Sequence, residues 1–242
     1  MNFLVLQHLD IESPALIGDL LREAGHHLHT AHVYAGDTLP ANTDHLHGII
    51  IMGGPQSAND THLSYIRDEL LWLQKRIDEG VPMLGICLGA QLMAKAAGGS
   101  IMPSPVRELG WFPVYPTAEA AADPLFSALP ATELTVFQWH GETFTLPDHA
   151  TLLATHPDVP AQVFRLGHCQ YGMQFHIEVD ASIIENWIAL GTSECAHLGN
   201  SGLNTLRQHT TAYLPDMRSF CRRLVEAWQH ACANNHNKRS PL

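Results

Sequence analysis

The sequence predicts an α/β fold in which a doubly wound, mostly parallel sheet is followed by a mixed or antiparallel extension and by C-terminal helices. Short apolar runs alternate with helix-like segments over roughly the first hundred residues, and short connections join them, which is typical of a parallel sheet. Between residues 106 and 176, strand-like runs follow one another with little helical pattern, which predicts the extension. A chain of 242 residues with 45% hydrophobic residues is long enough to bury a full core.

The elements of the parallel part follow in order from apolar patterning and from glycine and proline positions. Ser13 and Pro14 predict a helix cap and a first helical position, and the run 48–52 has the continuous apolar character of a strand buried on both faces. The expected strands cover 3–7, 29–35, 48–52 and 81–86. The expected helices cover 14–24, 59–79 and 89–97, and they end at Gly25, Gly80 and Gly98-Gly99.

The second half of the chain changes its rhythm. The expected strands of the extension cover 111–115, 134–139, 151–155, 162–166 and 172–176. Helical spacing returns after Ser182, and Pro215 is predicted to open the last helix. We therefore expect one unit over residues 1–180 and a helical extension over 181–242 that packs on the same domain.

Charge and composition exclude several classes of function. Thirteen Lys and Arg against 24 Asp and Glu give 13 − 24 = −11, and an acidic chain repels phosphates, so neither nucleic acid nor an anionic membrane is expected as a partner. The apolar runs are too short to cross a bilayer, and the first residues lack the pattern of a secretion signal, so the cytoplasm is the expected compartment. The 17 histidines show no metal-ligand spacing, and neither a metal nor another cofactor is expected.

A candidate nucleophile stands where a buried strand gives way to a helix, in Gly85-Ile86-Cys87-Leu88-Gly89. Such a nucleophile elbow holds its central residue in a strained turn, and glycines flank it because larger side chains would collide with the neighbouring strand and helix. The helix N-terminus favours the thiolate form of Cys87. The alternative is that Cys87 is a small buried hydrophobic residue.

Two further segments favour the catalytic interpretation. Residues i and i+2 of an extended chain point to the same side, so Glu178 can orient His176 as the general base of a thiol nucleophile. Gly53-Gly54-Pro55 ends another buried strand at the same carboxyl edge, where ligands bind in open α/β sheets. There the backbone N–H groups of Gly54 and Leu88 could form an oxyanion hole. A surface His-Glu pair and a plain turn are the alternatives for these segments.

Four segments in this order resemble the class I glutamine amidotransferase domain, which has a flavodoxin-like fold and a Cys-His-Glu triad. They are Gly-Gly-Pro-Gln-Ser at 53–57, Gly-Ile-Cys-Leu-Gly-Ala-Gln at 85–91, Trp-His-Gly-Glu at 139–142 and Gln-Phe-His-Ile-Glu at 174–178. The resemblance spans residues 1–180. Glu142 stands where the family often has Asp, and Ile177 where it often has Pro. Glu108 also lies in a segment that resembles the family.

The resemblance implies a role for each matching residue. Cys87 would attack the side-chain amide of glutamine, with His176 and Glu178 completing the triad, and water would hydrolyse the γ-glutamyl thioester after ammonia leaves. Gly54 and Leu88 would supply the oxyanion hole. The residues implied to bind the substrate are Gln56, Gln91, Trp139, His140, Gly141 and Glu142.

Three functional hypotheses remain open from the sequence. The first is a glutaminase that resembles the corresponding domain of GMP synthase and feeds ammonia to a separate synthetase, because residues 181–242 are too few for a synthetase domain. The second is a γ-glutamyl hydrolase or peptidase that uses the same chemistry on larger γ-glutamyl amides. The third is a regulatory module without activity, which the presence of His176 and Glu178 disfavours.

Overall fold

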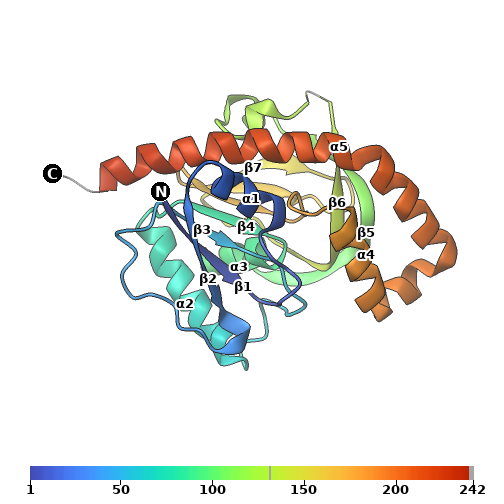
Figure 1. The fold of residues 1–242 in the computed structure, drawn as a ribbon, viewed down its shortest axis with the longest axis horizontal. Coiled ribbons are helices and arrows are strands. Elements are labelled where there is room, and N and C mark those ends of the chain that lie inside the picture. The colour runs from blue at the N-terminus through green and yellow to red at the C-terminus, as the bar shows by residue number, and fades with distance from the viewer. Residues whose placement is uncertain (131, 240–242) are drawn as a thin grey trace.

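A computed structural model describes residues 1–130 and 132–239, and within them nine strands form one curled sheet in the order β2-β1-β3-β4-β9-β8-β7-β5-β6 (Figure 1). The strands are β1 Asn2–Gln7, β2 His27–His32, β3 Gly48–Ile51, β4 Met83–Ile86, β5 Ile101–Pro116, β6 Leu134–Phe144, β7 Ala150–Thr155, β8 Val163–Leu166 and β9 Gln170–Met173. The pairings from β2 to β9 are parallel, and those among β9, β8, β7, β5 and β6 are antiparallel. The predicted mixed α/β class is therefore confirmed.

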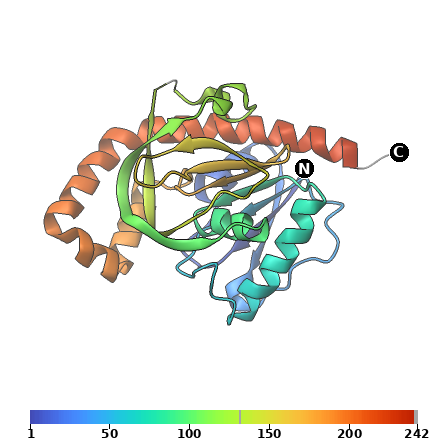
Figure 2. The same ribbon diagram turned by 180° about the vertical axis from the view of Figure 1, so that it is seen from behind.

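Helices cover both faces of the parallel part. The helices are α1 Ala15–Glu23, α2 Ser64–Asp78, α3 Leu88–Ala96, α4 Ala181–Leu190 and α5 Thr192–Arg239, with short 3-10 turns at Val33–Ala35, Glu119–Ala122 and Phe126–Ala128. The long helix α5 runs across the same face as α1, whereas α2 and α3 pack together on the other face (Figures 1 and 2). Alternate residues of the central strands fill two separate apolar clusters: Val5 and Ile50 pack toward α1 and α5, and Leu6 and Ile51 toward α2 and α3.

The helix starts differ from the sequence predictions for local reasons. Helix α1 begins at Ala15 with Pro14 as its N-cap and no side-chain cap, so the prediction that Ser13 caps it is wrong. The N–H of Leu16 donates instead to the carbonyl of Glu178, at 3.1 Å, from a distant part of the chain. Helix α2 begins at Ser64 rather than near 59, because the Asp60 carboxylate accepts from the N–H of Ser57 and holds a turn there.

Two later predictions also need correction. Pro215 does not open a helix but lies inside α5, whose one non-helical residue among those described is Gly199. Leu206 and Met217, on either side of this proline, are both buried, so packing holds the helix together across the lost hydrogen bond. Strand β5 is 16 residues long, since a register shift between Pro103 and Glu108 accommodates its first prolines.

The parallel part of the sheet positions the candidate site at one edge. Strands β1, β3 and β4 run in the same direction side by side, so their carboxyl ends meet. The segment after β1, Gly53-Gly54 after β3 and Cys87 after β4 therefore come together, although more than 30 residues separate each from the next in the sequence.

Candidate active site

The turn around Cys87 has the geometry of a nucleophile elbow. Cys87 has φ 51° and ψ −108°, and residues other than glycine rarely adopt a positive φ. A Cβ on Gly85 would lie 2.8 Å from the carbonyl oxygen of Gly89, and a Cβ on Gly89 would collide with the carbonyl oxygen of Ile51. Glycine at both positions is therefore what lets strand β4 turn directly into helix α3.

His176 is fixed by backbone and ring contacts from three directions. Its N–H donates to the carbonyl of Phe137 on β6 at 2.9 Å, and its Nδ1 lies 2.7 Å from Glu178 Oε1. The Trp187 ring of α4 meets the imidazole edge-on, with 4.8 Å between the ring centroids. Both His176 and Glu178 are almost completely buried.

The electrostatics favour the charged form of His176. Burial acts to lower the pKa of His176, but the Glu178 carboxylate and the Cys87 sulfur, by charge and by hydrogen bonding, raise that pKa well above its usual value. An imidazolium beside a sulfur in turn stabilises the thiolate. The arrangement can therefore hold a thiolate–imidazolium pair in a buried setting.

The glycines after β3 adjoin the elbow on its other side. A Cβ on Gly54 would lie 2.8 Å from the Cβ of His8 and 2.9 Å from Cδ2 of Leu88, so these two side chains pack closely against Gly54. Gln56 donates from Nε2 to the carbonyl of His8 at 3.2 Å. Gly54 and Leu88, which stand far apart in the sequence, are therefore neighbours beside Cys87.

A network of hydrogen bonds links α3 to β6. Gln91 donates from Nε2 to the carbonyl of Glu142 at 3.0 Å and to Oε1 of Gln174 at 3.2 Å, and Gln174 approaches Cys87 Sγ at 3.9 Å. His140 is hydrogen-bonded through Nδ1 to the same Glu142 carbonyl and through Nε2 to the buried Glu108 carboxylate. Because both ring nitrogens are engaged, His140 has only its main chain left to offer a ligand. Glu108 is fully buried and does not line the pocket described next.

A pocket of about 580 Å³ brings most of the predicted site residues together. It is lined by Gly54, Gln56, Cys87, Gln91, Trp139, His140, Gly141, Glu142 and His176. Leu88 and Glu178 are not among the residues that line it: Leu88 directly follows Cys87 in the chain, and Glu178 contacts His176.

The pocket also contains residues that sequence reasoning did not place there. Helix α4 and the start of α5 contribute Trp187, Leu190 and Glu194, and the segment after β1 contributes Glu12. Helical spacing after Ser182 predicts the helix that carries Trp187, but no pattern in the sequence could show that its ring contacts His176. Nothing in the sequence around Glu12 marks it either.

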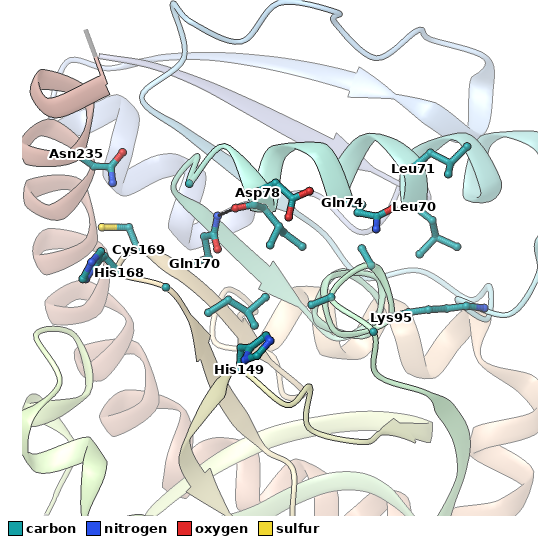
Figure 3. Close-up of a pocket in the computed structure, with 17 residues that line it drawn as sticks. Leu70, Leu71, Gln74, Asp78, Lys95, His149, His168, Cys169, Gln170 and Asn235 are labelled. Carbon is teal, nitrogen blue, oxygen red and sulfur yellow. Dashed lines mark hydrogen bonds between the residues drawn. The ribbon is translucent and has the colours of Figure 1, made fainter. Parts of the chain in front are cut away.

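A second hollow of comparable volume, about 630 Å³, lies elsewhere, between α2, the end of α3 and the turn before β9 (Figure 3). Its lining includes Leu70, Leu71, Lys95, His149 and Cys169. None of Cys87, His176 and Glu178 borders it, so size alone does not identify the reactive site.

Over residues 1–130 and 132–239, no group of three or more His, Cys, Asp or Glu side chains is arranged to hold a metal ion. In the same residues, no helix combines the length and apolar character that a membrane span requires, and this includes the 48-residue α5.

The family model described as "Glutamine amidotransferase class-I" matches residues 15–187, which include every site residue that the sequence predicts. The chain belongs to the class I glutamine amidotransferase family. Among curated relatives of this amidotransferase, the glutamine amidotransferase-like protein YfeJ of Salmonella typhimurium is 31% identical, over 78% of this chain and 80% of that protein. The GMP synthase of Porphyromonas gingivalis is 33% identical over 73% of this chain, but the match covers 33% of the synthase.

Solved structures of the family share the whole architecture. A glutamine amidotransferase from Thermotoga maritima has a TM-score of 0.85 and 26% identity, over 95% of this chain and 98% of that one. Another from Methylobacillus flagellatus has a TM-score of 0.85 and 26% identity, over 95% and 94% of the two chains. The C-terminal helices thus belong to an arrangement that these two amidotransferases share with this chain.

Proposed function

We propose that this amidotransferase hydrolyses the side-chain amide of glutamine through a covalent intermediate on Cys87. The thiolate attacks the amide carbonyl carbon, and the N–H groups of Gly54 and Leu88 stabilise the oxyanion that forms. His176 donates its proton to the leaving nitrogen, the C–N bond breaks, and ammonia departs from a γ-glutamyl thioester.

Water completes the cycle. Neutral His176 removes a proton from the water molecule as it attacks the thioester carbonyl, and the C–S bond breaks to return the thiolate and release glutamate. Glu178 holds Nδ1 and stabilises the imidazolium in both halves of the reaction. The single observation that carries this proposal is the Glu178–His176 contact of 2.7 Å in a pocket whose floor is a strained Cys87.

Binding of the amino-acid end of glutamine is proposed for the α3 and β6 residues. Because Gln91 spends both amide hydrogens on Glu142 and Gln174, its Oε1 is left to accept from the substrate α-amino group. The Glu142 carboxylate supplies the opposite charge for that group. Trp139 and the main chain of His140 and Gly141 form the adjoining wall, with Gln56 at the rim.

A γ-glutamyl hydrolase is the second candidate function, and the extent of the pocket favours it. The 580 Å³ pocket continues past Cys87 to Leu190 and Glu194. Its volume falls in the range of sites for drug-sized ligands, roughly 300–1,000 Å³. A γ-glutamyl amide with a larger leaving group would use this space, whereas a glutaminase would pass ammonia to a separate synthetase.

Mass spectrometry of the intact protein, mixed rapidly with glutamine or with γ-glutamyl peptides, tests both candidates. We expect an adduct of one γ-glutamyl group on Cys87, together with released ammonia or amine. Faster turnover of the peptides than of glutamine would establish the second candidate. Absence of an adduct and of product with every substrate, with and without cell extract to supply a partner, would reject both.

Replacement of the orienting acid should separate its role from that of the nucleophile. We expect Glu178→Gln to lower kcat for glutamine hydrolysis by about 10²- to 10⁴-fold, because the amide cannot stabilise the imidazolium and can favour the wrong tautomer. The matched control is Glu185→Gln on the exposed side of α4, where the carboxylate pairs with Arg207. It should stay within twofold of the wild type, and equal kinetics of the two variants would remove Glu178 from the mechanism.

We further propose that residues 1–180 form the amidotransferase unit and that residues 181–242 pack on it as part of the same domain. Buried side chains of α5, among them Met217, Leu224 and Trp228, lie in one apolar cluster with Phe3 of β1 and Tyr171 of β9, which supports this division.

A further inference from the structure

Glu12 brings an additional acid into the candidate active site. It lies in the segment that joins β1 to α1, where its N–H donates to the carbonyl of Leu9 at 3.1 Å. It lines the same pocket as Cys87 and His176. No hydrogen bond engages its carboxylate in the described part of the chain. Among the described residues, this carboxylate neither caps a helix nor pairs with an arginine or lysine.

The Glu12 carboxyl group and the His176 ring approach one another across Gly53. A Cβ on Gly53 would collide with Glu12 Oε2 and would lie 3.1 Å from His176 Cε1. The absent side chain of Gly53 therefore lets both groups occupy the same corner. Glu178 holds His176 at Nδ1, and the corner at Gly53 that Glu12 occupies borders Cε1, the carbon between the two ring nitrogens.

The charged groups that act on Glu12 come from two segments of the chain. His176 and Glu178 follow β9, and His8 follows β1. His8 is fully buried and lies 2.9 Å from Glu69 of α2, and this partner raises the pKa of His8 against the lowering effect of burial. Glu12 thus stands between two histidines, each of which already has its own glutamate.

These surroundings place the ionisation of Glu12 in the neutral range. Burial raises the pKa of Glu12 to about 7, helped by Glu178 and opposed by His176 and His8. The residue therefore changes charge beside His176 near neutral pH.

We propose that Glu12 is a positioning residue for His176, whose ionised carboxylate stabilises the imidazolium partner of the Cys87 thiolate. The inference rests on the proposed function, since it concerns the same nucleophile and base. An ionised Glu12 favours the imidazolium, and it acts on His176 rather than on the sulfur, because His176 is the group beside it across Gly53. The charged pair is therefore stabilised relative to the neutral thiol and imidazole. A protonated Glu12 lacks this effect.

The test measures the thiolate without any turnover. In the free wild-type protein, the ultraviolet absorbance of the Cys87 thiolate and the rate of its alkylation by iodoacetamide should both rise as the pH passes through about 7, the pKa of Glu12. Glu12→Gln should abolish this rise near pH 7. It should slow alkylation several-fold above neutral pH and change the alkylation rate little at acidic pH. Glu12→Asp should restore part of the rise, and Asp10→Asn, an exposed acid in the same segment, should leave it unchanged.

Protein stability gives a second readout that needs neither substrate nor thiol chemistry. The pKa of Glu12 is about 7 in the folded protein and near 4.5 when unfolded, so the folded state binds more protons between these values and its stability falls as the pH rises through them. Glu12→Gln cannot ionise. Its Tm should therefore exceed that of the wild type above pH 7, and the difference should shrink toward pH 4.5.

The outcomes separate this inference from the proposed function. An unchanged alkylation profile in Glu12→Gln, with glutamine hydrolysis intact in the wild type, would overturn the role of Glu12 alone. If Glu12→Gln loses the rise near pH 7 but the wild type hydrolyses no γ-glutamyl amide, the role of Glu12 would stand and the proposed function would be rejected. A lower affinity for glutamine with an unchanged thiolate profile would show that Glu12 binds substrate instead, and would also overturn the proposal.

Discussion

Cys87→Ala should reduce glutamine hydrolysis by about 10⁴- to 10⁶-fold while the protein stays folded. The substitution removes only the sulfur, which is the atom that would form the thioester, and leaves the proposed oxyanion hole and binding residues to give a small residual rate. Alanine adopts the φ of 51° at this position no less readily than cysteine does, so we expect little change in Tm. The measurement is ammonia release under saturating glutamine, with the intact mass read in parallel for the adduct.

Two controls make this result specific to the nucleophile. Cys169→Ala, in the hollow on another side of the molecule, should retain wild-type activity. A chloroketone analogue of glutamine should label the wild type and Cys169→Ala at Cys87 and should leave Cys87→Ala unlabelled. Undiminished hydrolysis by Cys87→Ala, or labelling of another cysteine, would contradict the assignment.

Residues whose placement depends on local backbone chemistry could be predicted from the sequence. Gly85 and Gly89 mark the elbow because a Cβ at either position would collide with neighbouring backbone, so the spacing of the two glycines identifies Cys87. The His176–Glu178 pair follows in the same way from the alternation of an extended chain. The parallel order of β1, β3 and β4 follows from short, continuously apolar strands joined through helices.

Residues whose placement depends on distant packing could not be predicted. Glu12 lies in an irregular segment, and its approach to His176 requires both the empty corner at Gly53 and the turn at the start of α1. In that turn the N–H of Leu16 donates to the carbonyl of Glu178, more than 160 residues away in the sequence. The contact of Trp187 with His176 likewise depends on how α4 docks against β6. Local signals carry no information on such contacts.

Trp228→Ala should destabilise the whole protein by about 3–5 kcal/mol, a large part of a typical free energy of unfolding. Trp228 is fully buried on α5, its ring lies 5.4 Å from that of Phe3 on β1, and its Cη2 atom lies 3.0 Å from where a Cβ on Gly48 of β3 would be. Truncation would leave a cavity between the C-terminal helix and the first strands. Chemical denaturation, followed by far-ultraviolet circular dichroism and by tryptophan fluorescence, measures the loss.

The form of the unfolding transition decides whether residues 181–242 belong to the same domain as the sheet. If α5 completes the core, both probes should report one cooperative transition at a lower denaturant concentration, because loss of packing at Trp228 weakens the β1 and β3 side of the sheet as much as the helix. Leu71→Ala, which removes an apolar side chain that is 65% exposed on α2, should change the free energy of unfolding by no more than about 0.5 kcal/mol. Separate melting of α5 before the sheet in Trp228→Ala would instead make the C-terminal helices an independent unit, and the candidate site would then have to retain its geometry without Trp187 of the adjoining α4.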